Sequence, residues 1–576
     1  MDTHSLALIS TLLLVFSAAI IGGVVAKLLK QPMLLGYIAA GILFGNLFPK
    51  ITDLGFLRSI ADAGVTLLLF TLGVEFSFHR LKRLLGTVTW AALVQVLLCI
   101  FLFLLFTMFL GFAFLPALII AIAASLSSTA VIVKVLAERG ELDTVPGEVM
   151  TGWLVVQDLC VVPIMILIPS IIAVTSKGDV SVVSVAGVLG LSFLKAAIAL
   201  SLIIILGKKV VPRVLGKVAN LGSREIFVLV TIGLVFLSAL ITYVLGLSAA
   251  LGAFVAGLLV AETSQNHAIF AEVRSLRDLF AVVFFVSLGM VIPFSYLTHA
   301  LSTLAILAAG VLFIKWFLVM GLMRFLGYHR KTAFLVAIGL IPMSEFGFII
   351  AQQSLNLGAI GNSQYILLIS LTFVTILLST PFLSQGHGLY YWVHGVLGKR
   401  WPSLFHTKQE LSVMSEELPY RDHVVLCGYG RVGKYIGRAL EMAGIPFVVV
   451  DYNNSTIASL KARGIPVVYG DPADKDVLDW AQVDFAKAVI IAIPDKHTQE
   501  MVIANVQTLN KHAKIICRTH HEEDQKILKS LGVEAVVQPE FEAAVSIVER
   551  LLPDFGVEDS EIAGKISRLK IEHGAG

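Results

Sequence analysis

The sequence predicts a polytopic α-helical membrane domain of about 13 spans, followed by a cytoplasmic α/β Rossmann-like domain. The first observation behind this is composition, because 57% of the 576 residues are hydrophobic and 14% are charged. Soluble domains have roughly 25% charged residues. The second is a series of apolar runs long enough to cross a bilayer, which fill the first two thirds of the chain. The third is a glycine loop between a strand and a helix in the last third.

The apolar runs and the basic residues between them predict the membrane topology. The spans are centred near Val15, Ala40, Leu67, Leu98, Ala124, Val161, Ile198, Val235, Phe254, Phe284, Ala309, Ile341 and Phe373. Lys and Arg concentrate in the loops after odd-numbered spans, whereas the even-numbered loops hold little beyond Lys50, Arg58 and Lys177. By the positive-inside rule the N-terminus lies outside and the C-terminal domain lies in the cytoplasm.

Net charge and cysteine usage exclude other classes. The formal net charge of +3 gives no general attraction to nucleic acid. The four cysteines are far apart and lack metal-ligand spacing, so we expect free thiols and no disulfide framework. Residues 5–26 are apolar, but no basic segment precedes them and no small-residue cleavage site follows, so we interpret them as a retained first helix.

The sixth span, Gly152 to Ile172, carries Gln157 and Asp158 within an apolar run. A carboxylate at membrane depth costs about 2.5–3.5 kcal/mol on insertion scales, so we expect it to serve an ion or a proton. The alternative is an Asp that faces water at a helix end, or one that is paired only to hold the helix bundle together.

Two stretches look like copies of each other. LLGYIAAGILFGN, from Leu34, is similar to LSAALGAFVAGLLVAET, from Leu247, and each is followed by a phenylalanine-bearing helix that contains Leu-Gly. The predicted topology starts the two copies on opposite sides of the membrane, which indicates an inverted repeat with a transport site near the midplane. The alternative is that composition bias alone produces similar Gly-rich helices.

Polar and helix-breaking residues interrupt two spans. In the fifth span they are Ser125, Ser127, Ser128 and Thr129, and in the twelfth they are Pro342, Ser344, Glu345 and Gly347. Unwound backbone at membrane depth is tolerated only where it lines a cavity or is buried in protein, and its oxygens suit an alkali cation. We therefore expect two discontinuous crossing helices beside Asp158.

Three further charges occur in or near spans. Lys315 lies in AGVLFIKWFLVMG, where it either pairs with Asp158 or extends toward a helix end. Glu345 lies either close to the cytoplasmic mouth or on the ion pathway. Glu75, near the cytoplasmic end of the third span, is interpreted as a surface or funnel residue rather than part of the core site.

The domain organisation follows from where hydropathy falls. We assign residues 1–386 to the membrane domain and 387–420 to a linker with a short interfacial helix, since aromatic residues there adjoin Lys399 and Arg400. Residues 421–540 form the nucleotide-binding domain and 541–576 a C-terminal tail.

The soluble domain begins with a dinucleotide-type motif. A strand at His423 to Cys427 leads into Gly428-x-Gly430-x-x-Gly433 and a helix, and a second strand ends in Asp451 about twenty residues on. The helix N-terminus attracts phosphate, and Asp451 would take the ribose hydroxyls. Further strands alternate with helical segments and predict a mostly parallel sheet. The alternative is a Rossmann fold with an empty site.

These motifs together resemble the monovalent cation:proton antiporter-2 family, and within it the Kef-type potassium efflux antiporters with a C-terminal regulator-of-potassium-conductance (TrkA-N) domain. The resemblance rests on GYIAAGILFG, SLSSTAVIVKVLAERG, GWLVVQDL, ALGAFVAGLLVAET, FFVSLGM, SEFGFIIAQ, CGYGRVG with Asp451, and YGDP at Tyr469 to Pro472. It covers residues 5 to 540, and the Gln-Asp pair is its most diagnostic element.

The resemblance implies roles for individual residues. Asp158 is expected to be the shared cation and proton site with Gln157 beside it, and a single carboxylate implies electroneutral exchange of one potassium or sodium ion for one proton. It also implies Thr129 and Ser128 on the crossover helix, Lys315 as a buried basic partner, and Gly428, Gly430, Gly433 and Asp451 on the nucleotide-binding loop. Further candidate site residues are Glu345 for ion transport, and Arg431, Val432 and Asp471 for the nucleotide.

The resemblance also implies partners. We expect a homodimer in a bacterial cytoplasmic (inner) membrane, no enzymatic activity, regulation by NAD(H) or an adenine nucleotide (AMP or ATP), and an ancillary regulatory subunit as one open option. Glutathione gating is in doubt, because Phe270, Val273 and Ser275 replace much of the acidic loop of Kef proteins. The open alternatives are a sodium/proton antiporter, a ligand-gated channel-like potassium efflux system, and, ranked lowest, a membrane-anchored NAD-dependent oxidoreductase.

Overall fold

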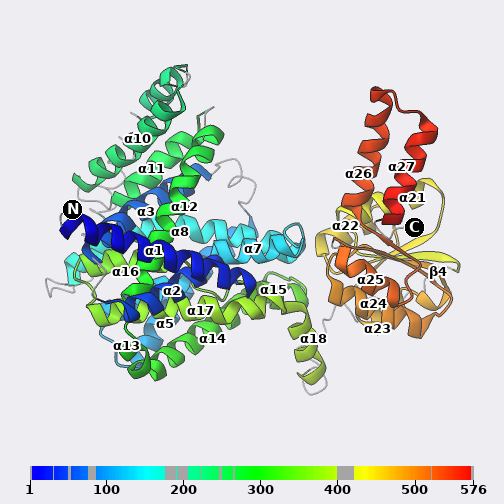
Figure 1. Cartoon of the computed structure of the whole chain (residues 1–576). Helices are drawn as coiled ribbons and strands as arrows, with labels where there is room; N and C mark the ends of the chain where they lie inside the picture. The colour runs from blue at the N-terminus through cyan, green and yellow to red at the C-terminus, as the bar shows by residue number, and fades with distance from the viewer. Residues whose placement is uncertain are drawn as a thin grey trace. The chain divides into compact units, whose positions relative to one another are not determined.

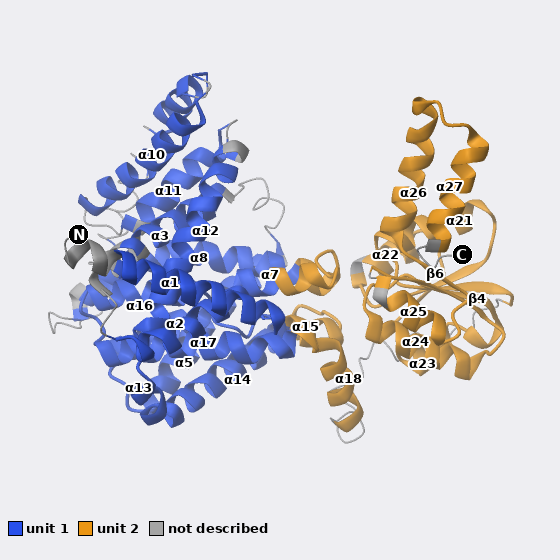
Figure 2. Cartoon of the chain, viewed as in Figure 1, with its two compact units in different colours: residues 1–132, 149–322, 337–383 blue, residues 133–148, 323–336, 384–576 orange. Residues whose placement is uncertain are grey.

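The structure is a computed structural model that divides into two compact units (Figure 2). Unit 1 comprises Met1–Ile132, Val149–Leu322 and Ala337–Leu383, and unit 2 comprises Val133–Glu148, Met323–Val336 and Ser384–Gly576. The residues described are 3–29, 31–49, 54–75, 86–175, 190, 201, 205, 207–218, 220–221, 223–244, 249–263, 266–397, 421–520 and 522–572.

The helices described as far as residue 397 are seen in Figure 1. They are α1 (Thr3–Leu28), α2 (Met33–Leu47), α3 (Leu54–Glu75), α5 (Thr87–Phe109), α6 (Phe114–Ser125), α7 (Thr129–Glu138), α8 (Val145–Thr175), α10 (Arg224–Val244), α11 (Ala249–Ala261), α12 (Asn266–Met290), α13 (Phe294–His299), α14 (Leu301–Phe325), α15 (Arg330–Gly339), α16 (Phe346–Asn356), α17 (Asn362–Ser384) and α18 (Gly386–Leu397).

The described residues contain six helices long and apolar enough to cross a membrane, and four shorter apolar helices. Every predicted span centre in the described part of the chain falls within a helix except Ile341, which lies where a helix is interrupted. The predicted centre at Ile198 lies outside the described residues, so the count of thirteen spans stays a prediction. Multi-pass membrane architecture is confirmed.

Two helix crossings in unit 1 are reciprocal. A Cβ built on Gly41 of α2 would lie 2.2 Å from the Val286 carbonyl oxygen of α12, and one built on Gly257 of α11 would lie 2.1 Å from the Phe70 carbonyl oxygen of α3. In the predicted repeat α2 corresponds to α11 and α3 to α12. Each copy's first helix therefore crosses the other copy's second helix at a glycine, which is consistent with a two-fold relation between the copies; the inverted topology stays a prediction.

Both predicted discontinuous helices are present. α6 ends at Ser125 and α7 begins at Thr129, while α15 ends at Gly339 and α16 begins at Phe346. The two interruptions, residues 126–128 and 340–345, are called break 1 and break 2 here. They meet in an antiparallel bridge between Ser127 and Met343.

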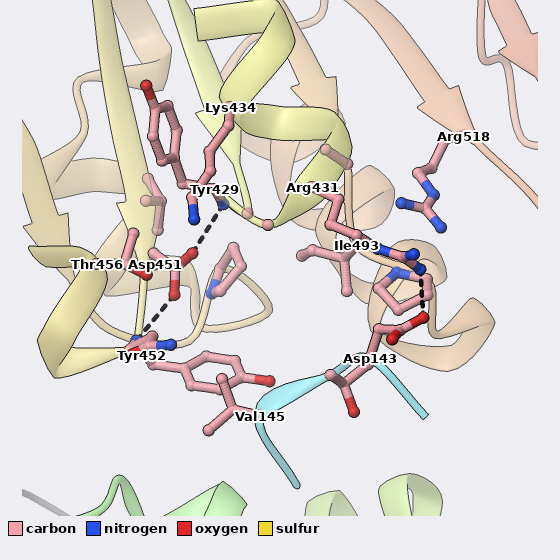
Figure 3. A pocket seen from close by; sticks show the side chains of 18 of the residues that line it. Asp143, Val145, Tyr429, Arg431, Lys434, Asp451, Tyr452, Thr456, Ile493 and Arg518 are labelled. Carbon is pink, nitrogen blue, oxygen red and sulfur yellow. Dashed lines mark hydrogen bonds and ion pairs between the residues drawn. The ribbon is translucent and has the colours of Figure 1, made fainter. Parts of the chain in front are cut away.

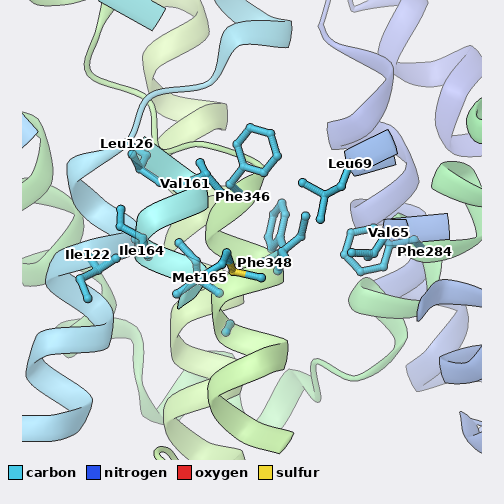
Figure 4. Packing of buried hydrophobic residues seen from close by; sticks show 14 of the residues in the cluster. Val65, Leu69, Ile122, Leu126, Val161, Ile164, Met165, Phe284, Phe346 and Phe348 are labelled. Atoms are coloured by element: carbon cyan, nitrogen blue, oxygen red, sulfur yellow. The ribbon is translucent and has the colours of Figure 1, made fainter. Parts of the chain in front are cut away.

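Apolar side chains surround the breaks. Leu126 from break 1, Val161 from α8 and Phe346 from the start of α16 belong to one buried cluster that also includes residues of α3 and α12 (Figure 4). Residues 126–128 and 340–344 of the breaks are buried, which raises the cost of any unpaired backbone group there.

The C-terminal part of unit 2 is a parallel sheet with helices on both faces. Its elements are β1 (His423–Cys427), α21 (Arg431–Met442), β2 (Phe447–Asp451), α22 (Asn454–Ala462), β3 (Val467–Tyr469), α23 (Lys475–Trp480), η1 (Val483–Phe485), β4 (Ala486–Ile491), α24 (Lys496–Leu509), β5 (Lys514–Arg518), α25 (Glu522–Ser530), β6 (Ala535–Val537), α26 (Pro539–Leu551), η2 (Leu552–Phe555) and α27 (Asp559–Glu572). The strand order is β3-β2-β1-β4-β5-β6, and every pair is parallel.

The helices of this sheet are divided between its two faces (Figure 1). α21 and α22 pack on one face, while α23, α24 and α25 pack on the other. The predicted parallel, Rossmann-like sheet is confirmed, and its doubly wound strand order places the glycine loop after the central strand β1. The predicted C-terminal tail contains two helices, α26 and α27, which share a small apolar cluster through Val545, Ile562 and Ile566.

We predict that Gly257→Val destabilises the membrane domain by about 1–3 kcal/mol, because a side chain there overpacks the crossing between α11 and α3. The measurement is thermal unfolding of the full chain in detergent. Gly233→Ala on α10 is the matched control, since no described atom lies within 4 Å of a Cβ built there. Equal melting temperatures for the two variants would contradict the assigned close approach.

Candidate ion-exchange site and nucleotide pocket

Asp158 lies on α8 next to break 1. Its Oδ2 atom accepts a hydrogen bond of 2.8 Å from the hydroxyl of Thr129, the first residue of α7. The Asp158 side chain is half-buried, whereas its neighbour Gln157 is fully buried. The structure thus brings together the predicted carboxylate and the predicted crossover residue, at the point where backbone oxygens are released from helix hydrogen bonding.

Gln157 joins α8 to break 1 and to α5. Its Oε1 atom accepts the Ser127 backbone N–H at 2.9 Å, and its Nε2 atom donates to Gln95 Oε1 at 2.5 Å. Gln95 also accepts the indole N–H of Trp153 at 3.1 Å. The sequence analysis missed Gln95, although an amide in the middle of a 23-residue apolar helix is a usable signal.

Lys315 on α14 is fully buried and binds both breaks. Its ammonium group donates to the carbonyl oxygens of Leu126 at 2.7 Å and Pro342 at 3.2 Å. These carbonyls follow the C-terminal ends of α6 and α15, where the helix dipoles place partial negative charge. The predicted pairing of Lys315 with Asp158 is not among the described contacts and stays a prediction.

Glu345 lies at the end of break 2 and faces the N-terminus of α7. Its Oε2 atom accepts the Ser128 hydroxyl at 2.8 Å, and the Ala130 backbone N–H also donates to the carboxylate. A carboxylate at a helix N-terminus offsets the partial positive charge there. The structure places Glu345 where the two breaks cross. Its role on the ion pathway stays a prediction.

The crossing is therefore electrostatically balanced. Lys315 binds the carbonyl ends of two half-helices, and Glu345 binds the amide end of a third. Asp158 and Thr129 add a carboxylate and a hydroxyl directly beside break 1. Carboxylate, hydroxyl and carbonyl oxygens are hard ligands that can hold a monovalent cation, and a carboxylate can hold a proton in its place.

A pocket of about 330 Å³ opens at the carboxyl edge of the parallel sheet in unit 2 (Figure 3). Gly428, with φ +91°, turns the chain after β1, and no described atom lies within 4 Å of a Cβ built on Gly430. The predicted residues Gly428, Gly430, Arg431 and Asp451 line this pocket. Open space beside Gly430 at the N-terminus of α21 is where a phosphate would be held.

Asp451 ends β2 with both carboxylate oxygens bound to backbone. Oδ2 accepts the Tyr429 N–H at 2.7 Å, and Oδ1 accepts the Asn453 N–H at 2.8 Å (Figure 3). Burial raises the pKa of Asp451 in spite of these donors and of Lys434 nearby. The remaining lone pairs face the pocket edge, where a ribose hydroxyl could donate.

Three of the other predicted nucleotide residues lie elsewhere. Among the described residues that line the pocket, Val432, Gly433 and Asp471 are not found. A Cβ on Gly433 would lie 2.2 Å from the Gly428 carbonyl oxygen, so this glycine serves the packing of the loop against α21. Asp471 forms an ion pair of 2.9 Å with Lys331 instead.

One wall of the pocket comes from the connector between α7 and α8, residues 139–144. Gly140, Asp143 and Thr144 line the pocket, and Asp143 forms an ion pair with Arg431 of the glycine loop (Figure 3). Sequence reasoning could not find this wall, because Asp143 and Arg431 are 288 residues apart in the chain. The pocket therefore contacts the connector that follows the half-helix α7.

The start of α15 is held by a buried ion pair in the same unit. Lys331, 1% exposed, binds Asp471 and also donates to Thr498 Oγ1 at 3.0 Å and to the Tyr391 hydroxyl of α18. Burial opposes ionisation of Asp471, but Lys331 outweighs it and lowers the pKa of this carboxyl. The preceding His329 stacks on Tyr452, with ring centroids 5.3 Å apart.

The connector is held in a similar way. Arg139 binds Glu141 at 2.8 Å and Asp495 at 3.5 Å, and His387 of α18 lies 3.2 Å from Asp495 and 3.5 Å from Glu141. Burial opposes ionisation of Asp495, but His387 and Lys331 outweigh it and hold its pKa at about 2. Glu141, His387 and Asp495 have metal-ligand atom types within 4.8 Å of one another, but Arg139 already balances the carboxylates.

The sequence matches two protein families along its length. Residues 14–385 match the family described as sodium/hydrogen exchanger, transmembrane, and residues 424–539 match the TrkA-N domain. Both ranges fall inside the predicted domains 1–386 and 421–540, whose exact boundaries stay predictions.

Curated relatives match nearly the whole chain. The YbaL protein of Escherichia coli (strain K12) is 29% identical over 95% of this chain and 98% of its own length. The glutathione-regulated potassium-efflux system protein KefC of Klebsiella pneumoniae (strain ATCC 700721) is 31% identical over 97% of this chain and 86% of its own length.

A solved structure matches the C-terminal domain. The C-terminal domain of a Shewanella denitrificans Kef protein, solved in an AMP-bound form, is 27% identical over 27% of this chain and 92% of that chain, with a TM-score of 0.24. The family matches and the relatives agree with the order of domains in the structure. The chain therefore belongs to the sodium/hydrogen exchanger family and is a membrane cation/proton antiporter with a C-terminal TrkA-N domain.

Proposed function

We propose that this antiporter exchanges potassium for protons, one for one, through the carboxylate of Asp158. The single observation that supports this most is the hydrogen bond of Thr129 to Asp158 at break 1. It combines a titratable group with the oxygen ligands of an unwound helix in a partly buried setting. An empty anion is unfavourable in a medium of low dielectric constant, so the carboxylate must carry a cation or a proton whenever it moves between the two sides.

Potassium rather than sodium is the proposed cation. The support is the KefC relative, whose name describes a potassium-efflux system. This chain matches 86% of the length of that relative. Sodium is the alternative, because the family match of the membrane domain is to sodium/hydrogen exchangers. Break-lining oxygens suit either ion, so the distinction depends on the width of the site rather than on the type of ligand.

The proposal includes location and assembly. The chain acts as a homodimer in a bacterial cytoplasmic membrane, with its N-terminus outside and its TrkA-N domain in the cytoplasm. The support for orientation is the distribution of Lys and Arg among the loops. The proposal leaves room for an ancillary regulatory subunit.

Regulation by NAD(H) or an adenine nucleotide is also proposed. The pocket at the sheet edge has the open space beside Gly430 and the carboxylate of Asp451 that such a ligand uses. The connector after α7 forms one wall of the pocket, and α15 begins at the buried pair of Lys331 and Asp471. α7 and α15 are the half-helices that flank the two breaks, so a ligand in the pocket can bias the exchange site.

We predict that Asp158→Asn abolishes exchange in proteoliposomes, because an amide cannot alternate between cation and proton. The measurement is cation-dependent dequenching of a pH dye, scanned over lithium, sodium, potassium and rubidium. Asp278→Asn is the matched control, since this carboxylate is exposed and paired with Arg277. Undiminished exchange by Asp158→Asn would contradict the assignment, and a larger response to sodium than to potassium would contradict the proposed cation.

We predict that Gly430→Val lowers affinity for NADH or AMP by at least about tenfold, because its side chain fills the space for phosphate without touching the protein. Binding is measured by calorimetry on the full chain in detergent, together with the melting temperature. Gly433→Val is the comparison: its side chain would collide with Gly428, so it should unfold the domain. Unchanged affinity of Gly430→Val would place the ligand elsewhere.

We predict that Lys331→Met uncouples the pocket from exchange. The substitution leaves Asp471 buried without its ion pair, so α15 loses its attachment to the TrkA-N domain. Nucleotide affinity should stay within about threefold of the original, since Lys331 lies outside the pocket lining. The effect of nucleotide on the exchange rate should disappear.

Lys496→Met is the control for this variant. Lys496 forms a partly exposed ion pair with Asp524, unlike the buried pair of Lys331 and Asp471. It should preserve both binding and regulation. A Lys331→Met protein that still responds fully to nucleotide would exclude α15 as the route of coupling.

A further inference from the structure

Gln95 on α5 is a polar side chain in a helix that is otherwise apolar along its middle. It is fully buried, and its hydrogen bonds leave α5 altogether. Nε2 donates to the Ser125 carbonyl oxygen at 3.0 Å, and Oε1 accepts from Gln157 at 2.5 Å and from Trp153 at 3.1 Å. One amide therefore binds the last residue of α6 and two residues of α8.

These contacts fix which way the Gln157 amide points. The Ser127 N–H needs an acceptor, so the atom 2.9 Å from it must be the amide oxygen of Gln157. The nitrogen of Gln157 then points to Gln95 Oε1, whose own acceptor role is confirmed by the indole N–H of Trp153. If either amide group were flipped, a donor would face a donor or an acceptor would face an acceptor.

The network also sets the backbone of break 1. Ser125 and Ser127 lie on either side of Leu126, and their backbone groups bind Gln95 and Gln157 respectively. Two residues further on, Thr129 donates to Asp158. The path from Gln95 to the carboxylate therefore consists of the Gln95–Gln157 and Gln157–Ser127 hydrogen bonds, the backbone from Ser127 to Thr129, and the Thr129–Asp158 hydrogen bond.

We propose that Gln95 is a positioning residue for cation exchange, which orients the Gln157 amide and through it the backbone of break 1. Gln157 then acts as a strut between α8 and break 1 rather than as a cation ligand, because its oxygen is committed to Ser127. Asp158 and Thr129 contact the cation, and Gln95 keeps them at the right distance from each other. This proposal rests on the proposed exchange at Asp158.

The test compares variants of the full chain in proteoliposomes by their apparent KM for potassium and their maximum exchange rate. Gln95→Met keeps an unbranched chain of similar size but leaves the groups on Ser125, Gln157 and Trp153 unpaired. We expect its KM to rise about tenfold, the factor that corresponds to 1.4 kcal/mol and lies within the cost of an unpaired buried polar group. The maximum rate should stay within about twofold, because cation binding rather than movement is impaired.

Gln95→Glu is the conservative variant, since its protonated carboxyl group keeps an acceptor for both N–H groups and offers an O–H donor to the Ser125 carbonyl oxygen. Its KM should stay within about threefold of the original. Thr107→Val is the matched control on the same helix, because the buried Thr107 hydroxyl binds only carbonyls of α5 in the described contacts. A tenfold rise in KM for either of these variants would overturn the proposal, and Gln95→Glu keeps the test valid even if Gln95→Met is recovered in low yield.

A double substitution tests the shared path. If Gln95 acts mainly through Gln157, adding Gln95→Met to Gln157→Met raises the KM by a smaller factor than Gln95→Met does alone, because only the direct bond to Ser125 remains to be lost. Fully multiplied effects overturn the proposal. Failure of this inference is distinct from failure of the proposed function. The former leaves Asp158-dependent exchange with an unchanged KM in Gln95→Met, and the latter leaves no Asp158-dependent exchange in the original protein.

Discussion

Unwound backbone in a water-poor interior is the constraint on which the rest of the membrane domain depends. A helix interrupted at bilayer depth releases N–H and C=O groups that cannot reach water, and each one left unpaired costs free energy. Here the groups of one break are met partly by the other break, through the Ser127–Met343 bridge and a bond of 2.7 Å from Ser127 Oγ to Leu340 O. Lys315, Glu345 and Gln157 meet others, so the charged and amide residues of the site are first of all partners for backbone.

This constraint bears on the proposed coupling between the nucleotide pocket and the exchange site. The two breaks bind each other and share Lys315, so α7 and α15 are joined at the ends that meet there. The opposite ends of both half-helices lie in unit 2, at Arg139 and Glu141 after α7 and at Lys331 before α15 (Figure 2). Separating the two partners of a buried ion pair is costly. A movement of the TrkA-N domain is therefore expected to move the ends of α7 and α15 with it.

The sequence predicted those features of the site that depend on residues close together in the chain. Asp158 in an apolar run, the Ser/Thr cluster of break 1 and the glycine loop were all found from sequence, because their cost or geometry shows in a few neighbouring residues. Asp471 was assigned to the nucleotide and instead pairs with Lys331, since nothing near it in the chain reveals a partner 140 residues away. The wall supplied by Asp143 was missed for the same reason.

The bond between Ser127 and Leu340 also bears on how the chain is made. The two residues are 213 positions apart, so at 5–20 residues per second roughly 10–40 s pass between their synthesis. During that interval break 1 is already in or near the bilayer without its main backbone partner. Gln95 and Gln157, only 62 positions apart, are present early and bind the same segment. Their hydrogen bonds to the backbone of Ser125 and Ser127 do not depend on the second half of the chain, so these two backbone groups can be paired before that half has been made.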